Sequence, residues 1–84
     1  MSRVSVEYGR LVKSFLERNH LTFRAAAFGS GISAAYWKDM ADGRVPSAQA
    51  IEKVCAAFPE LDENALLRAA GYAQKFDDND AVEF

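Results

Sequence analysis

The segment from residue 21 to residue 46 constrains the fold more than any other part of the chain, because it carries regularly spaced capping and turn residues. Thr22 and Ser33 favour helix N-termini, since a side-chain oxygen at that position accepts a free backbone N–H. Between them, Gly29-Ser30-Gly31 predicts a tight turn, because glycine adopts positive φ at no steric cost. We therefore expect two short helices, over residues 23–28 and 34–41, joined by this turn.

Capping residues and apolar spacing predict three further helices outside that segment. Tyr8, Val12 and Phe15 recur at helical spacing and predict the buried face of a first helix. Ser47 and Asp62 are suitable N-caps for two later helices. These three helices are expected over residues 4–18, 48–58 and 63–70. The predicted fold class is therefore all-α, a compact five-helix bundle, with Ile32, Trp37 and Met40 filling the core around residues 23–41.

Charge is unevenly distributed along the chain, although the net charge is only −2. Four acids, Asp77, Asp78, Asp80 and Glu83, lie in residues 73–84 against Lys75 alone. We predict one domain over residues 1–72, close to neutral, followed by an acidic, flexible tail over residues 73–84. A near-neutral domain is a weak match to a nucleic-acid binder, but one local basic stripe is sufficient for binding.

Several classes of function are disfavoured by what the chain lacks. Cys55 is the single cysteine, so no internal disulfide is possible, and its apolar neighbours predict a core residue. His20 is the single histidine and lies in a connector without a second metal-type ligand at metal spacing. No catalytic set, phosphate-binding loop, metal site or cofactor is therefore expected, and the protein is not expected to be an enzyme. Without an apolar leader or an apolar run of ~18 residues, a cytoplasmic protein with no membrane partner is expected.

Several residues resemble the pattern of a known family when they are taken together and in order. They are Leu21-Thr22, Ala27 four residues before Gly31, Gly31-Ile32-Ser33, Trp37 and Met40, Gly43 with Pro46-Ser47, and the closing Leu66–Tyr72. This pattern resembles the Xre-type, or phage repressor/Cro-type, helix-turn-helix domains over roughly residues 8–72. The resemblance implies a repressor-like bundle that binds operator DNA as a homodimer and regulates transcription, with the helix over residues 34–41 in the major groove.

The chain departs from the family pattern at positions that matter for packing and for recognition. Many members pair an arginine in the first helix with a glutamate late in the third, where this chain has Leu16 and Ala41. Replacing both members of a buried ion pair with apolar groups is often neutral. Many members also hold a glutamine where this chain has Phe23. That phenylalanine is expected either to tuck against the first helix or the His20 connector, or to make an apolar contact with a thymine methyl group or with a protein partner.

The resemblance places the candidate DNA-binding residues on the second and third helices and the loop after them. Arg24, Lys38 and Arg44 supply charge for phosphates, while Ala34 and Ala35 offer only methyl groups to bases. An aspartate at position 39 accepts from cytosine N4 but repels phosphates, so direct base readout is expected to be thin, with DNA shape contributing more. The full predicted set is Thr22, Phe23, Arg24, Ser33, Ala34, Ala35, Tyr36, Lys38, Asp39 and Arg44.

A second interpretation keeps the fold but changes the partner. Phe23, Ala34, Ala35 and Tyr36 are predicted to form a semi-apolar patch, which often marks a protein contact. The chain would then be an antirepressor, an antitoxin-like protein or a modulator of another regulator. A positive rim around the alanines favours DNA, whereas a neutral or acidic face favours a protein. A dimer seam is expected among Leu67, Tyr72, Phe76 and Phe84.

Overall fold

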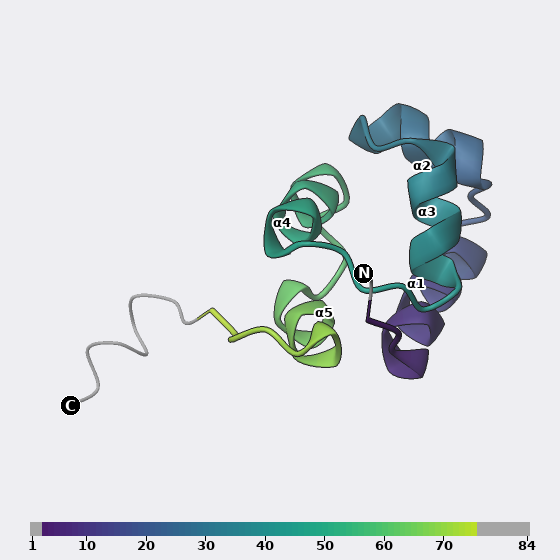
Figure 1. Ribbon diagram of the computed structural model, residues 1–84. Helices are drawn as coiled ribbons and strands as arrows, with labels where there is room; N and C mark the ends of the chain where they lie inside the picture. The colour runs from purple at the N-terminus through teal and green to yellow at the C-terminus, as the bar shows by residue number, and fades with distance from the viewer. Residues whose placement is uncertain (1–2, 76–84) are drawn as a thin grey trace.

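A computed structural model describes residues 3–75, and within this range the chain forms five α-helices (Figure 1). They are α1 (Val6–Arg18), α2 (Phe23–Ser30), α3 (Ala34–Ala41), α4 (Ala48–Ala57) and α5 (Glu63–Ala70). The predicted all-α, five-helix architecture is confirmed.

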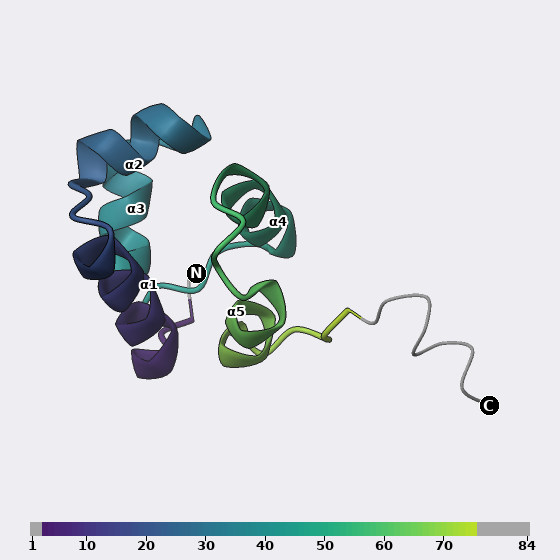
Figure 2. The same ribbon diagram turned by 180° about the vertical axis from the view of Figure 1, so that it is seen from behind.

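The helices form two groups that enclose a single core. In Figures 1 and 2, α1, α2 and α3 lie on one side of the molecule and α4 and α5 on the other. α3 packs against α1 and α2, while α4 packs against α2 and α5, and α5 packs against α1. Phe15, Trp37 and Phe58 meet where the groups join, with ring centroids 5.2–6.3 Å apart. These distances suit favourable aromatic pairing, so one aromatic cluster ties the two groups together.

Each helix begins at a residue whose side chain accepts a backbone N–H. The four predicted N-caps are confirmed at Thr22, Ser33, Ser47 and Asp62. Ser5 is a fifth, which caps α1 by accepting from the N–H of Tyr8. Since an N-cap contributes about 1 kcal/mol, these residues define where each short helix starts.

The first helix begins at Val6, so the predicted start at Val4 was wrong. Residues 3–5 instead pair with residues 43–45 in an isolated antiparallel bridge. The N–H of Ser5 donates to the carbonyl of Gly43 at 2.7 Å, and the N–H of Val45 donates to the carbonyl of Arg3 at 2.9 Å. The N-terminal segment therefore fixes the loop between α3 and α4.

The second helix runs to Ser30, so the predicted end at Phe28 and the three-residue turn over 29–31 were also wrong. Only Gly31 leaves the helical region, with φ of 75°, and its N–H closes the helix on the carbonyl of Ala27. Gly29 remains helical because Ser30 is held by buried hydrogen bonds, so the helix extends two residues beyond Phe28.

The first and third helices approach each other closely at Gly9. A Cβ at this position would lie 2.8 Å from the carbonyl oxygen of Ala41 and 2.9 Å from the nitrogen of Gly43. Leu16 and Ala41 are both buried in the same region. The expected apolar replacement of a buried ion pair is therefore consistent with this packing.

The segment predicted as an acidic tail is described only over residues 73–75. The side-chain amide of Asn64 donates to the carbonyl of Lys75, and its oxygen accepts from the N–H of Lys75, both at 2.8 Å. The ammonium group of Lys75 lies 2.7 Å from Glu52 and 3.1 Å from Glu63. Residues 73–75 therefore lie against α4 and α5, and the acids of residues 77–83 lie outside the described residues.

Candidate nucleic-acid interface

One side of α3 is buried and fixed by defined partners. Trp37, Met40 and Ala41 form this inner side, and each is almost fully buried. The hydroxyl of Tyr8 on α1 donates to the Sδ of Met40 at 3.5 Å. The inward orientation predicted for Trp37 and Met40 is confirmed. Because these residues fix the rotation of α3, they also determine which side chains face outward.

Ser30 joins α2 to α3 through a buried hydrogen-bond network that the sequence did not suggest. Its Oγ accepts from the indole N–H of Trp37 at 2.9 Å and from the N–H of Ile32 at 3.1 Å. The same hydroxyl donates to the carbonyl of Ala26 at 2.7 Å. A buried tryptophan usually requires an acceptor for its N–H. This requirement was the one signal in the sequence that a nearby polar residue such as Ser30 would have a structural role.

The outer face of α3 consists of Ala35, Lys38, Asp39 and Asp42, with Tyr36 at its edge. All five residues are exposed, and Tyr36 only just so, at 37 %. Ala34, which was predicted beside Ala35, is half-buried. The outer face therefore presents one methyl group, one ammonium group and two carboxylates to the surroundings.

Lys38 does not act as a free cation on this face. Its Nζ lies 3.0 Å from Asp42, one turn later on the helix. Both side chains are more than half exposed, so this pair contributes little to stability. It does neutralise Lys38 locally, which leaves Asp39 as the uncompensated charge at the centre of the face.

Two arginines border α3 and make no ion pair with any residue in the range 3–75. Arg24 lies in the first turn of α2, which packs against α3, and Arg44 follows α3 in the loop. Both were predicted as phosphate contacts, and both are exposed. We refer to them as the arginine pair.

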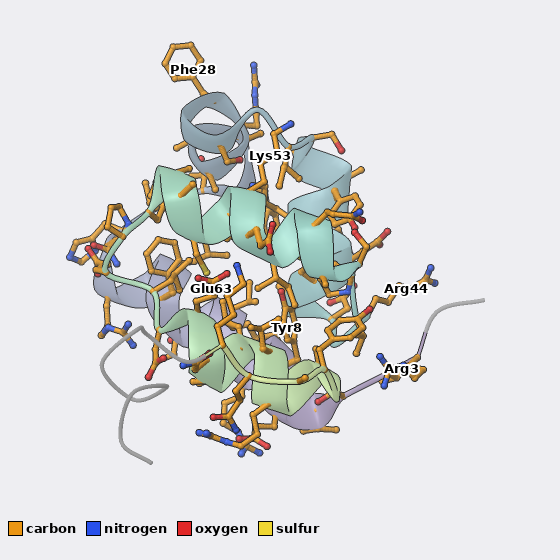
Figure 3. All side chains as sticks on the ribbon, turned by 90° about the vertical axis from the view of Figure 1, so that its left-hand side faces the viewer. Arg3, Tyr8, Phe28, Arg44, Lys53 and Glu63 are labelled. Atoms are coloured by element: carbon orange, nitrogen blue, oxygen red, sulfur yellow. The ribbon has the colours of Figure 1, made fainter. Side chains whose placement is uncertain are left out.

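The backbone of Arg44 is fixed by contacts with α3 and with the N-terminal segment. Its N–H donates to the carbonyl of Asp39 at 3.0 Å, and it pairs with Val4 across the antiparallel bridge. Figure 3 shows Arg3 and Arg44 at the same end of the molecule. The guanidinium of Arg3 lies 5.3 Å from the centre of the Tyr72 ring, within the range of a cation–π contact. The prediction missed Arg3 because its position depends on pairing between distant residues.

Thr22 and Ser33, the two residues of the predicted set with an aliphatic hydroxyl, serve as helix caps. Thr22 Oγ1 accepts from the N–H of Ala25 at 3.0 Å, and Ser33 Oγ accepts from the N–H of Tyr36 at 3.1 Å. Both residues are exposed. Each hydroxyl keeps its own proton and can still donate it to an acceptor such as a phosphate oxygen.

Phe23 lines a hollow of about 540 Å³ between α1 and α3, together with Leu16, His20, Leu21 and Ala41. It is half-buried and packs against the core. Of the two interpretations offered for Phe23, the structure therefore agrees with tucking against α1 and the His20 connector. The proposed patch of Phe23, Ala34, Ala35 and Tyr36 is correspondingly reduced to its last two members.

Phe28 is the most exposed large apolar side chain among the described residues, at 95 %. It projects away from α2 and contacts no other labelled residue in Figure 3. The sequence prediction placed it at the end of a helix and assigned it no role. Its outward position became visible only once the inner side of α2 was known to face Trp37 and Ser30.

Cys55, the single cysteine of the chain, is kept in its protonated form by its surroundings. Cys55 is half-buried against the core, and burial raises its pKa to about 11, with the nearby carboxylates of Glu63 and Asp62 acting in the same direction. It is therefore protonated at neutral pH and a poor nucleophile. Within residues 3–75, no group of three His, Cys, Asp or Glu side chains is placed to hold a metal ion.

The predicted dimer seam is only partly described. Leu67 is buried in the core, so it is not available at a surface. Tyr72 is half-buried and its hydroxyl donates to the carbonyl of Pro46 at 2.7 Å. Phe76 and Phe84 lie outside the described residues.

Comparison with protein-family models, with curated proteins and with solved structures finds no match to this chain. None of the helices in the described range is long and apolar enough to cross a bilayer. Inferences about function therefore rest on the geometry of the candidate interface and on the resemblance noted in the sequence.

Proposed function

We propose that this protein binds double-stranded DNA, with α3 in the major groove, and regulates transcription as a repressor. The resemblance to Xre-type domains supports this proposal by analogy, which does not by itself establish function. The arrangement of α2, the turn at Gly31 and α3 supports it on geometry, because α2 packs across α3 and leaves the outer face of α3 uncovered.

The arginine pair is the observation that carries the proposal. Arg24 in the first turn of α2 and Arg44 in the loop after α3 are both exposed, and neither has an ion-pair partner within the described range. Cations at the borders contact phosphates and position a protein on the duplex, while the helix between them faces the base edges. Across residues 22–46 they outweigh Asp39, because Lys38 and Asp42 neutralise each other.

We further propose that the protein acts as a homodimer on two half-sites. In helix-turn-helix dimers the half-sites lie one helical turn apart, about 34–36 Å, so the operator mirrors the two-fold axis of the protein. A dimer doubles the number of phosphate contacts, which matters because each domain supplies few cations of its own to the DNA interface. Sedimentation velocity on the free protein, and then on its DNA complex, measures the stoichiometry directly.

Selection of duplexes from a random pool at low salt, followed by fluorescence anisotropy, tests DNA binding. Log affinity for the selected duplex is expected to fall with log salt, with a slope of about −0.9 for each phosphate contact. The double variant Arg24→Gln, Arg44→Gln is expected to reduce the magnitude of that slope by about 2 per protomer. Arg68→Gln, an exposed arginine on α5, is the matched control and should retain the wild-type slope. Failure to enrich any duplex over random DNA would contradict the proposal.

A protein partner is the second candidate function, and the exposure of Phe28 favours it. Phe28 is 95 % exposed, and its ring offers a partner an aromatic surface that it can bury. The carboxylates of Asp39 and Asp42 also suit a basic partner surface. Affinity capture with wild-type protein and with Phe28→Ser tests this alternative. A stoichiometric partner retained by the wild type and lost by the variant would support it, and identical recovery would count against it.

A further inference from the structure

Asp39 occupies the centre of the outer face of α3, directly opposite the buried side. Successive residues of a helix are rotated by about 100°, so the burial of Trp37, Met40 and Ala41 turns Ala35 and Asp39 fully outward. Asp42 shares that face but is paired with Lys38 at 3.0 Å. Among residues 3–75, no side chain forms an ion pair or a hydrogen bond with the carboxylate of Asp39. It is therefore the one carboxylate on this face without a cationic partner among the described residues.

A small hollow of about 100 Å³ adjoins Asp39 at the end of α3. Met40, Val45 and Pro46 form its apolar wall, and the remaining lining residues are Tyr36, Asp39 and Arg44. Asp39 and Arg44 line the same hollow without forming an ion pair. The hydrogen bonds of residues 3–5 to the loop fix the position of this wall. The hollow therefore combines an acceptor with a nearby cation, and it is large enough for a single functional group of a base.

A carboxylate discriminates between base edges because it accepts hydrogen bonds and cannot donate them. In the major groove, cytosine presents the N4 amino group as a donor, whereas guanine presents N7 and O6, which are both acceptors. Adenine presents the N6 amino group beside the acceptor N7, which opposes the second carboxylate oxygen, so cytosine is the better match. A carboxylate facing guanine N7 and O6 would leave acceptors opposed without a proton between them. Arg44, which lines the same hollow, can contact a phosphate and offset the repulsion that Asp39 would otherwise experience.

Ala35 lies on the same outward line, four residues before Asp39. The two residues are about 6 Å apart along the helix axis, which spans about two base-pair steps of 3.4 Å. The methyl group of alanine is suited to contact the 5-methyl group of a pyrimidine in the major groove. Thymine and 5-methylcytosine both present this group at the same place.

We propose, on the premise that the protein binds DNA as inferred above, that Asp39 reads the amino group of a cytosine while Ala35 contacts a 5-methylpyrimidine about two steps away. The outer face of α3 then selects for an exposed amino donor and a methyl group and selects against guanine at the Asp39 position. This preference is the reverse of that of an arginine reader, which binds guanine through O6 and N7.

Anisotropy titrations with variants of the pool-selected duplex test this assignment. Replacing the cytosine by thymine is expected to weaken binding about tenfold, within the range for loss of one base contact. Replacing the thymine near Ala35 by uracil removes only the methyl group and is expected to weaken binding about fourfold. Replacing that thymine by 5-methylcytosine, with guanine opposite, keeps the methyl group and should preserve most of the affinity, whereas unmethylated cytosine should not.

The variant Asp39→Asn tests the carboxylate itself. An amide both donates and accepts, so the preference is expected to move from cytosine to adenine, which an asparagine binds through N6 and N7. Glu7→Gln is the matched control, since it removes the charge of an exposed carboxylate on α1 and leaves the Lys38–Asp42 pair intact, and it should leave base preference unchanged. Enrichment of guanine at that position, or a cytosine preference that survives Asp39→Asn, would overturn the assignment while leaving DNA binding intact. Absence of any enriched duplex would overturn both proposals.

Discussion

The side chains on the inner side of α3 have partners within the protein, whereas most of those on its outer face do not. On the inner side, Trp37 and Met40 each have a polar partner as well as close apolar neighbours. On the outer face, Ala35 and Asp39 have no side-chain partner among the described residues. The inner side therefore determines the fold, and the outer face is the side on which substitutions can change binding without changing the scaffold.

Trp37→Ala is expected to have the largest effect on the inner side. Truncating a fully buried aromatic costs about 3–5 kcal/mol, which is comparable to the whole stability of many domains of this size. The variant should be largely unfolded by circular dichroism at 25 °C. Trp37→Phe keeps an aromatic ring and should remain folded with a lower urea midpoint. A cooperative transition at the wild-type midpoint for Trp37→Ala would refute this description of the core.

Ser30→Ala removes the hydroxyl that joins the two helices. The indole N–H of Trp37 and the N–H of Ile32 would then lose their acceptor in a buried region, with an expected loss of about 1–3 kcal/mol in urea denaturation. Ser14→Ala is the control, because its hydroxyl accepts only from the exposed Arg18. Equal midpoints for the two variants would show that Ser30 is not the connection between α2 and α3.

Sequence reasoning was most successful where structure depends on neighbouring residues. The caps at Thr22, Ser33, Ser47 and Asp62 and the inward face of α3 follow from local chemistry and helical period. It failed where the position of a residue depends on distant segments. The bridge of residues 3–5 to residues 43–45 is one example, and the extension of α2 to Ser30, whose hydroxyl accepts from Trp37, is another.

The features of the candidate site also divide into those that depend on neighbouring residues and those that depend on distant segments. The exposure of Arg24, Lys38 and Arg44 could be predicted, because hydrophobic periodicity places them away from the core. The neutralisation of Lys38 by Asp42 could have been inferred from their i, i+4 spacing, but not the geometry that leaves Asp39 beside Arg44. That arrangement requires the loop after α3 to fold back, which no local pattern specifies.

The stability of the protein at alkaline pH depends on Tyr8, a residue of α1 that contacts the inner side of α3. Burial raises the pKa of Tyr8 well above its usual value of 10.0, so the folded protein retains a proton that the unfolded chain releases. The contribution is intact below pH 10 and is lost as pH rises further, at up to about 1.4 kcal/mol per pH unit. Tyr8→Phe should flatten the fall in stability between pH 10 and pH 11, while Tyr36→Phe, on the outer face, should not. Parallel curves for wild type and Tyr8→Phe would contradict the burial of this hydroxyl.

Substitutions on the outer face are expected to have the smallest effect on stability. Ala35→Ser and Asp39→Asn replace exposed side chains without partners, so unfolding free energies should lie within about 0.5 kcal/mol of wild type. Urea denaturation of both variants is the measurement. A loss above 1.5 kcal/mol, comparable to Ser30→Ala, would mean that the outer face supports the fold and is not free for recognition.

The most direct test of the account is a ¹⁵N HSQC titration of the protein with a pool-selected duplex. Shift changes are expected at the amides of Thr22, Arg24, Ser33, Ala35 and Arg44, with little change along α5. These exposed residues lie at the start of α2, on α3 with its N-cap, and in the loop after α3. Shift changes centred on Phe28 and α4 that leave Ala35 and Arg44 unaffected, or no saturable change at all, would contradict the claim that α3 is the DNA-binding helix.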